Sequence, residues 1–177
     1  MNYNDWMKAS DLSSSEYNPY YSVYINLNED EDLLTGLRNS SSQTQKYFET
    51  IPKNKLEYRY DRGKWSIKEI LQHIIDTERV FSYRAMRIAR KDNTPLTGFD
   101  QDTYVERSDA DSRDIKELLL EYRTLRESTI QMFYGFTENM LRNVGEASNS
   151  PLSPRAAGFI ISGHEKHHCR VIKERYL

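Results

Sequence analysis

Trp65-Ser66-Ile67-Lys68-Glu69-Ile70 is the clearest helix start in the chain. Ser66 can accept a hydrogen bond from the backbone of Glu69, while the Glu69 side chain accepts one from the backbone of Ser66, and this pair forms a capping box. The tryptophan before the cap can pack on the isoleucine at the end of the stretch as a hydrophobic staple. Apolar residues then recur three and four positions apart, which predicts an amphipathic helix over about 66–91. Its apolar stripe consists of Ile67, Ile70, Ile74, Phe81 and Ala85.

A second helix is predicted before this one, over 28–51. Asn28 is the expected cap, and the acidic residues 29–31 suit the positive end of the helix dipole. Pro52 ends the helix, because proline cannot continue the hydrogen-bonding pattern.

Two more helices are predicted in the second half of the chain. In the segment 112–136, apolar residues alternate at spacings of three and four, as in the seam of a helical bundle. The last helix covers 154–176, because Ser153-Pro154 places a capping serine directly before a proline at the first helical position. Four long amphipathic helices predict an all-α fold, a four-helix bundle.

The connections divide the chain into one bundle and a leading arm. The linkers 52–65, 92–111 and 137–152 contain turn residues, and no convincing strand is predicted in any of them. The middle linker is too long for a tight antiparallel connection and is expected to cross over along the bundle. We therefore predict a four-helix domain over 28–177 and an aromatic arm over 1–27 that packs on it.

The arm is rich in tyrosine, with Tyr17, Tyr20, Tyr21 and Tyr24 around Asn18-Pro19. Tyrosine buries its ring readily while its hydroxyl reaches water, so these residues are expected to pack the arm against the bundle. In the alternative, one or two of them line the mouth of a functional pocket.

Composition favours a soluble, cytoplasmic globular protein. The 177 residues include 37% hydrophobic and 29% charged residues, which suits one domain with a single core. No apolar run approaches the length of a membrane span, and the N-terminus lacks a secretory signal pattern. Cys169 is the single cysteine, so it is expected to be a packing residue rather than part of an internal disulfide. A net charge of −2 gives no general attraction to nucleic acid or membranes.

Three histidines are placed to share one metal ion. His164 and His168 lie in Gly163-His164-Glu165-Lys166-His167-His168, four residues apart and therefore on one face of the last helix. Both fall within the apolar stripe, and His73 lies at the flank of the stripe on another core helix. His167 points away and is not counted as a ligand. The alternative is a set of core histidines satisfied by hydrogen bonds, yet burying three imidazoles without partners is costly.

Two more polar residues are candidates for the chemistry. Asp76 is one turn beyond the first of these histidines, so it is expected to orient a ligand or act as an acid or base, or else to form a structural ion pair. Arg175 falls on the same side of the last helix and is a candidate either for a buried ion pair or for contact with an anionic substrate. Glu78 and Glu165 are expected to face solvent or other helices.

These features resemble the DinB-like (damage-inducible, YfiT-like) superfamily over nearly the whole chain. The resemblance implies a four-helix bundle, often a homodimer, with a divalent metal, commonly nickel or zinc, held by three histidines that correspond to His73, His164 and His168. Some family members are transferases that use low-molecular-weight thiols, others are called metal-dependent hydrolases, and many have no assigned activity. The motifs that carry the resemblance are Gly63–Ile70, His73–Arg79, Tyr83–Ala85, Ile88–Arg90, Gly163–His168 and Glu174–Tyr176.

The sequence thus predicts a metal-dependent enzyme that activates water or a thiol for attack on a small electrophilic substrate. A three-ligand site leaves a coordination position open, and such sites are more often reactive than structural. The competing prediction is a protein that binds metal or a small ligand without catalysis, for which a fourth protein ligand would be expected.

Overall fold

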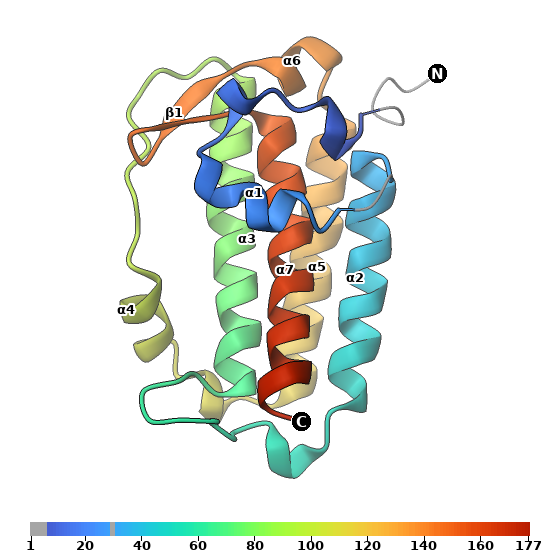
Figure 1. The fold of residues 1–177 in the computed structure, drawn as a ribbon, viewed down its shortest axis with the longest axis vertical. Helices are drawn as coiled ribbons and strands as arrows, with labels where there is room; N and C mark the ends of the chain where they lie inside the picture. Colours follow the sequence, from blue (N-terminus) through green and yellow to red (C-terminus); the bar gives the residue numbers. More distant parts are fainter. Residues whose placement is uncertain (1–6, 29–30) are drawn as a thin grey trace.

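Four long helices form the body of the protein, in a computed structural model that describes residues 7–28 and 31–177 (Figure 1). They are α2 (Leu33–Thr50), α3 (Ile67–Ala89), α5 (Ile115–Tyr134) and α7 (Pro154–Arg175). The predicted all-α four-helix bundle is confirmed. None of the described helices is both long enough and apolar enough to cross a membrane.

Shorter elements lie in the arm and in the connections between the long helices. The short α-helices are α1 (Ser22–Ile25), α4 (Gln101–Glu106) and α6 (Glu138–Arg142), and the strands are β1 (Gly145–Ala147) and β2 (Ser150–Leu152). Single 3-10 turns occupy Ala9–Asp11, Ser14–Glu16, Pro19–Tyr21, Lys53–Lys55 and Ala110–Ser112.

The order of the helices around the bundle explains the long connection. Both α5 and α7 pack against α2 and α3. The helices α3 and α5 run in one direction, and α2 and α7 run in the other (Figure 1). Since α3 and α5 are parallel neighbours, the segment that joins the end of α3 to the start of α5 must run back along the length of the bundle. The segment 92–111 makes this crossover, as the sequence predicted, and carries α4 on the way.

Two helix starts agree with the sequence analysis. The capping box of α3 is present, with the Glu69 backbone N–H 3.1 Å from Ser66 Oγ and the Ser66 backbone N–H 2.7 Å from Glu69 Oε2. At α7, Ser153 Oγ accepts a hydrogen bond from the backbone of Ala156 at 3.1 Å, and Pro154 occupies the first helical position. These caps fix where α3 and α7, which carry the histidines, begin.

The predicted start of the first long helix was wrong. Asp32 caps α2, accepting a hydrogen bond from the backbone of Thr35 at 2.9 Å. Asn28 instead ties the end of α1 to α7, since its amide donates to the carbonyl oxygen of Phe159 at 2.8 Å and accepts from Ser162 at 2.6 Å. Of the acidic residues expected in the first turn, 29 and 30 lie outside the described residues, as do residues 1–6 of the arm.

The segment 137–152 also differs from its prediction as a linker without strands. Here β1 and β2 pair antiparallel, with Gly145 opposite Leu152. Ser148 and Asn149 join the strands, and both have positive φ angles, of 54° and 58°. This geometry is that of a two-residue hairpin turn. Strands of three residues are too short to produce a recognisable alternation in the sequence.

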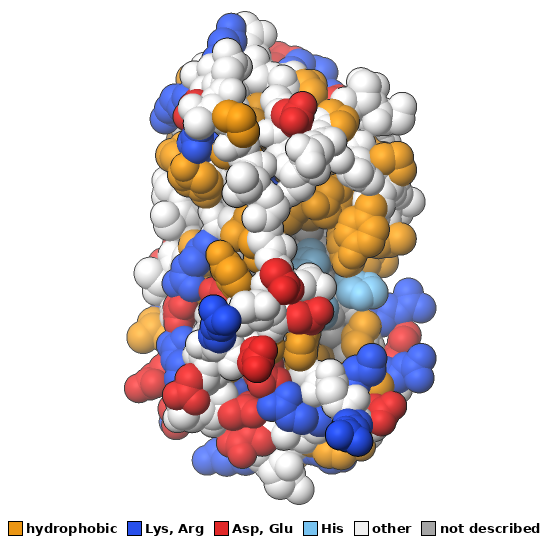
Figure 2. Space-filling model, turned by 90° about the vertical axis from the view of Figure 1, so that its left-hand side faces the viewer, with side chains coloured by type: hydrophobic (Ala, Val, Ile, Leu, Met, Phe, Trp, Pro, Cys, Tyr) orange, Lys and Arg blue, Asp and Glu red, His pale blue; other side chains and the backbone are white. Residues whose placement is uncertain are grey.

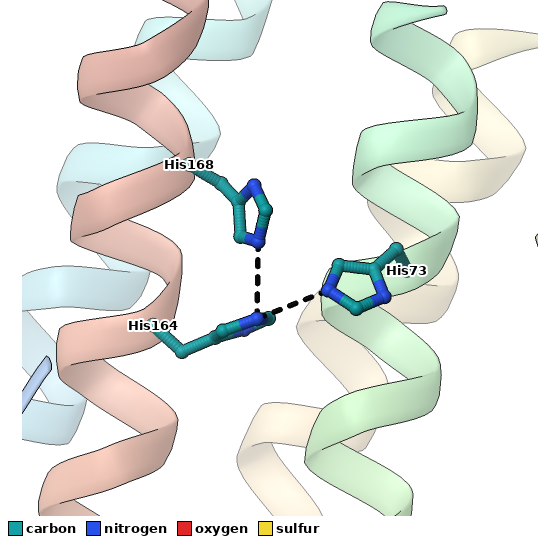
Figure 3. Close-up of side chains that lie close together, drawn as sticks. All are labelled: His73, His164 and His168. Atoms are coloured by element: carbon teal, nitrogen blue, oxygen red, sulfur yellow. Dashed lines mark hydrogen bonds between the residues drawn. The ribbon is translucent and has the colours of Figure 1, made fainter. Parts of the chain in front are cut away.

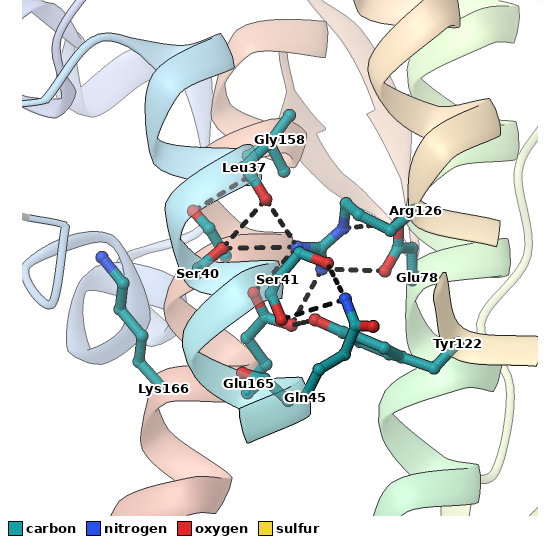
Figure 4. Close-up of polar contacts among 12 residues, drawn as sticks. Leu37, Ser40, Ser41, Gln45, Glu78, Tyr122, Arg126, Gly158, Glu165 and Lys166 are labelled. Atoms are coloured by element: carbon teal, nitrogen blue, oxygen red, sulfur yellow. Dashed lines mark hydrogen bonds and ion pairs between the residues drawn. The ribbon is translucent and has the colours of Figure 1, made fainter. Parts of the chain in front are cut away.

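A buried charge network lies at the centre of the bundle (Figure 4). Arg126 of α5 donates to Glu78 of α3 and to Glu165 of α7, with nitrogen–oxygen distances of 2.9 Å to each carboxylate. Its Nη1 also donates to the carbonyl oxygen of Leu37 in α2 at 3.0 Å, and Tyr122 donates to Glu165. All four helices therefore meet at one guanidinium. The two glutamates face other helices, and neither reaches solvent.

Candidate metal centre

Three imidazole nitrogens converge between α3 and α7 (Figure 3). His164 Nε2 lies 3.0 Å from His73 Nε2 and 3.0 Å from His168 Nε2. The ligand atoms of the three residues all lie within 4.8 Å of one another. The sequence placed these residues on two core helices, and the structure brings them together.

Aromatic side chains enclose the histidines. The Trp65 ring centroid lies 4.6 Å from that of His73 and 6.5 Å from that of His168, and the Tyr24 centroid lies 5.2 Å from that of His164. His73 and His164 are buried, and His168 is partly exposed. Trp65 therefore has a second use beyond the predicted staple on α3, as one wall of the site.

Burial holds these imidazoles in their neutral form. It lowers the pKa of His73 to about 4. Burial also moves the pKa values of His164 and His168 well below the usual range, and the neighbouring histidines lower them further. A neutral imidazole has a free lone pair, which a metal ligand needs.

The geometry suits a divalent ion on three histidines. Nitrogens bound to one tetrahedral ion at about 2.0–2.1 Å lie roughly 3.3 Å apart, and two of the three nitrogen–nitrogen distances here are 3.0 Å. Within the described part of the chain, no carboxylate or thiol joins the group as a fourth donor. Three neutral nitrogens and an open fourth position are the arrangement found in catalytic zinc sites.

The structure places the remaining candidates around this centre. His167 is outside the cluster, with its ring 5.3 Å from the rings of both Tyr24 and His168. Asp76 accepts hydrogen bonds from Gln72 at 3.0 Å and Arg79 at 3.3 Å, rather than from a histidine. The contact with Arg79 is an ion pair, the structural alternative that the sequence analysis gave for Asp76. Burial raises the pKa of the Asp76 carboxyl.

The other two candidates lie farther along α7. Arg175 is exposed at the end of the helix. Cys169 packs 3.7 Å from Thr44 Oγ1, and burial raises the pKa of its thiol to about 12. The thiol therefore stays protonated near neutral pH, which agrees with its prediction as a packing residue.

Two pockets lead to the histidines from the side of the crossover. One, of about 300 Å³, is lined by Tyr24, Thr77, Phe81, Arg84, Gln101 and His164. The other, of about 260 Å³, is lined by Lys64, Trp65, Gln101, His167, His168 and Tyr176. Gln101 of α4 lines both, so the crossover separates the two approaches. Figure 2 shows histidine side chains on this face, one recessed and one at the surface, between hydrophobic and acidic groups.

The arm forms part of the first pocket. Tyr20, Tyr21 and Tyr24 line it, and α1 packs on α7. The tyrosines thus pack the arm on the bundle and also line a pocket at the histidines, which combines the two alternatives considered from the sequence. Sequence reasoning did not find Thr77 or Arg84. Thr77 lies one turn after His73, which is a usable signal, whereas Arg84 is one of several arginines in that helix.

Comparison with known families gives a direct match. A model of the DinB superfamily matches residues 37–172. The chain belongs to the DinB superfamily. The family expected from the histidine motifs is therefore confirmed.

Individual DinB relatives agree in sequence and in fold. The chain is 24% identical over 148 residues to a protein of Oceanobacillus iheyensis named "putative metal-dependent hydrolase", covering 81% of this chain and 84% of that protein. It also resembles the solved structure of YfiT from Bacillus subtilis, described as "a probable metal-dependent hydrolase with an unusual four-helix bundle topology". That match has a TM-score of 0.71 at 16% identity and covers 80% of this chain and 82% of YfiT.

Proposed function

We propose that this DinB protein is a metal-dependent hydrolase whose His73, His164 and His168 hold one divalent ion, nickel or zinc. The observation that carries the proposal is the convergence of three neutral imidazole nitrogens beside two open pockets. The names of the DinB relatives support hydrolysis as the reaction. When bound, such an ion activates a water molecule, or alternatively a low-molecular-weight thiol, by lowering its pKa.

The chain's own residues would orient the substrate and limit access of solvent. Trp65 and Tyr24 pack against the histidine rings and fix their positions. Asp76 lies one turn from His73, and Gln72 and Arg79 hold its carboxylate. Because burial raises its pKa, we propose Asp76 as a group that exchanges protons with the site through an intervening water molecule.

Other parts of the proposal concern substrate and assembly. Arg175 adjoins Tyr176, which lines the pocket at His168, so it stays a predicted contact for an anionic part of the substrate. A homodimer and a cytoplasmic location also stay predictions. The competing function, ligand binding without catalysis, is less favoured because the described residues provide three donors to the cluster and no fourth.

Metal content and turnover, measured on matched variants, test the proposal. We expect protein purified without a histidine tag to bind one equivalent of nickel or zinc. His168→Ala should lose the ion and the hydrolysis of any ester found by substrate screening. His167→Ala is the matched control and should keep both, because its ring lies outside the cluster. Asp76→Asn should keep the ion and lose roughly 10²-fold in rate or more.

The alternatives give different results in the same assays. Equal metal content in His168→Ala and His167→Ala would contradict the assignment of ligands. Turnover only with an added thiol would replace hydrolysis by thiol transfer. A fully metal-loaded protein inactive against both substrate classes would favour the binding function.

A further inference from the structure

The pocket beside His164 contains a buried positive charge without an acidic partner. Arg84 is 4% exposed, and no carboxylate among the described residues lies within ion-pair distance of it. The lining of the pocket includes no aspartate or glutamate from the described part of the chain. Burying a guanidinium without a counter-charge is costly, so such residues are normally paired.

The contacts of Arg84 leave donors for a ligand. Its Nη2 donates to the carbonyl oxygen of Thr97 at 2.9 Å and to Ser148 Oγ at 2.8 Å. The phenol of Tyr21 also interacts with the guanidinium, and the Phe81 ring centroid lies 5.3 Å from its central carbon. A guanidinium has five N–H groups, and the two bonds from Nη2 leave the three N–H groups of Nε and Nη1 for Tyr21 and a ligand.

A hydroxyl without a hydrogen-bond partner lies toward the histidines in the same pocket. Thr77 is 4% exposed, and its Oγ1 has no hydrogen-bond partner. It is seven residues before Arg84 on α3, a rise of about 10 Å along the helix. The pocket therefore offers a positive guanidinium at one end, and a hydroxyl with a histidine at the other. The remaining wall is mainly aromatic, formed by Tyr20, Tyr21, Tyr24, Phe81 and Phe99.

We infer that this pocket binds a small carboxylic acid whose carboxylate pairs with Arg84 and whose apolar body lies on the aromatic wall. The other end of the molecule, with a polar group that reaches Thr77, then lies beside His164. The positive charge of Arg84 favours a carboxylate, and the N–H groups that Thr97 and Ser148 leave unused can donate a charge-assisted hydrogen bond to it. The volume of about 300 Å³ suits a ligand of this size. This inference rests on the proposed function and specifies its substrate class.

Pairs of an acid and its neutral amide separate the effect of ligand charge on affinity from the effect of ligand shape. The probes are 3-phenylpropionate, 4-phenylbutyrate and 5-phenylvalerate, each compared with its neutral amide by isothermal titration calorimetry. Chelator-treated protein is used first, because a carboxylate could otherwise bind a metal ion directly. We expect at least one carboxylate to bind roughly tenfold tighter than its amide, as charge-assisted hydrogen bonds require.

Variants test whether Arg84 causes this preference. Arg84→Gln should abolish the difference between acid and amide, and Arg84→Lys should keep part of it because the charge remains. Arg107→Gln, which removes an exposed arginine from the crossover, should leave the difference unchanged. Since each comparison is made within one variant, a general loosening of the pocket would weaken acid and amide alike.

The outcomes distinguish this inference from the metal proposal. Equal affinity for acid and amide in the wild type, no binding of any carboxylate at millimolar concentration, or an unchanged preference in Arg84→Gln would overturn the inference. A protein that shows the Arg84-dependent preference but binds no metal would retain the carboxylate site and lose the metal proposal. Metal bound by the histidines without any preference for the acid would retain the metal proposal and overturn the carboxylate site.

Discussion

At the scale of single residues, the buried polar groups of α3 and α5 differ in how far their hydrogen-bonding capacity is used. Arg126 is fully satisfied by Glu78, Glu165 and the carbonyl oxygen of Leu37, which fixes the spacing of four helices. Thr77 Oγ1 has no hydrogen-bond partner and lies in the pocket beside His164, and Arg84 lies at the other end of that pocket. The satisfied guanidinium thus holds the bundle together, and the unpartnered Thr77 hydroxyl is available to a ligand in the pocket.

Removing the central guanidinium should destabilise the bundle severely. Arg126→Met would leave Glu78 and Glu165 buried without a positive partner, and breaking such a pair costs roughly 3–5 kcal/mol. Burial alone would lower the pKa of Arg126, but the two carboxylates outweigh this and raise it, so the arginine is charged at all working pH values.

Urea denaturation followed by circular dichroism measures this loss. Arg123→Met on the same helix is the matched control, because that side chain is 55% exposed and its substitution should change the unfolding free energy by less than about 1 kcal/mol. Similar destabilisation in both variants would show that the buried network is not a major source of stability.

The convergence of the histidines was predictable because helical spacing places two of them on one face of α7 and the third at the flank of the apolar stripe of α3. Residues four apart share a helix face, so His164 and His168 follow directly from the sequence. Arg84 and Arg126 carry no such signal. Each is one arginine in a charged helix. Only the packing of α3 against α5, α7 and the hairpin shows that Arg126 pairs with carboxylates and that Arg84 does not.

At the scale of elements, the arm depends on one glycine of α7. A Cβ atom at position 163 would lie 1.9 Å from the backbone carbonyl oxygen of Tyr24, so α1 can approach α7 only where a side chain is absent. Gly163→Ala should displace the arm and destabilise the protein by roughly 1–3 kcal/mol. Because Tyr24 packs on His164, the displacement should also open the site.

Hydrogen exchange of residues 17–27 would detect the displaced arm. Gly36→Ala in α2 is the control, because the nearest atom to a Cβ there is 3.9 Å away, and alanine favours a helix. Equal protection of the arm amides in Gly163→Ala and in the wild type would contradict this prediction, since α7 would then accommodate the methyl group while α1 stays packed on it.

A second contact anchors the arm in a pH-dependent way. Glu16 pairs with Arg155 at 2.5 Å and accepts a hydrogen bond from Ser153 at 2.8 Å. Burial opposes ionisation of Glu16, but its hydrogen bonds to Arg155 and Ser13 outweigh this and lower its pKa below 4.5. A carboxyl with a lowered pKa in the folded state stabilises at pH values above 4.5, and this contribution is lost as the pH falls below that value.

Glu16→Gln should therefore remove roughly 3 kcal/mol at pH 7 and flatten the acid limb of the stability profile. The measurement is the unfolding free energy of wild type and variant at pH 7, 4 and 3, with the difference expected to shrink as pH falls. Glu49→Gln, at an exposed glutamate, should show a small and constant difference. A Glu16→Gln effect that grew toward low pH would contradict the sign of the argument.

Helix boundaries were predictable where caps are local and failed where a tertiary contact competes. Ser66 and Ser153 cap as expected because their partners lie three residues away. Asn28 looked like an equally good cap, but its side-chain amide forms hydrogen bonds with Phe159 and Ser162 on α7. The helix α2 is therefore capped by Asp32 instead. No local pattern contains that information.

At the scale of the whole molecule, metal binding should appear as thermal stability. A ligand present at 100 times its dissociation constant stabilises the folded state by about 2.7 kcal/mol if it binds only that state. For a chain of this length, that corresponds to a rise in melting temperature of roughly 5–10 °C. Differential scanning calorimetry with added nickel or zinc should show the rise in the wild type and in His167→Ala. The same rise in His168→Ala would place the ion elsewhere.

The histidines also come from distant parts of the chain, since His73 and His164 are separated by 91 positions. An ion held by both would act as a reversible cross-link that closes a very long loop, and the entropy of closing a loop grows with its length. His164 and His168, one turn apart, would bind the ion weakly in a partly formed helix before α3 packs on α7 and adds His73. The order of events in folding would then depend on metal supply, with nascent chains in metal-poor conditions reaching the same bundle by a slower route.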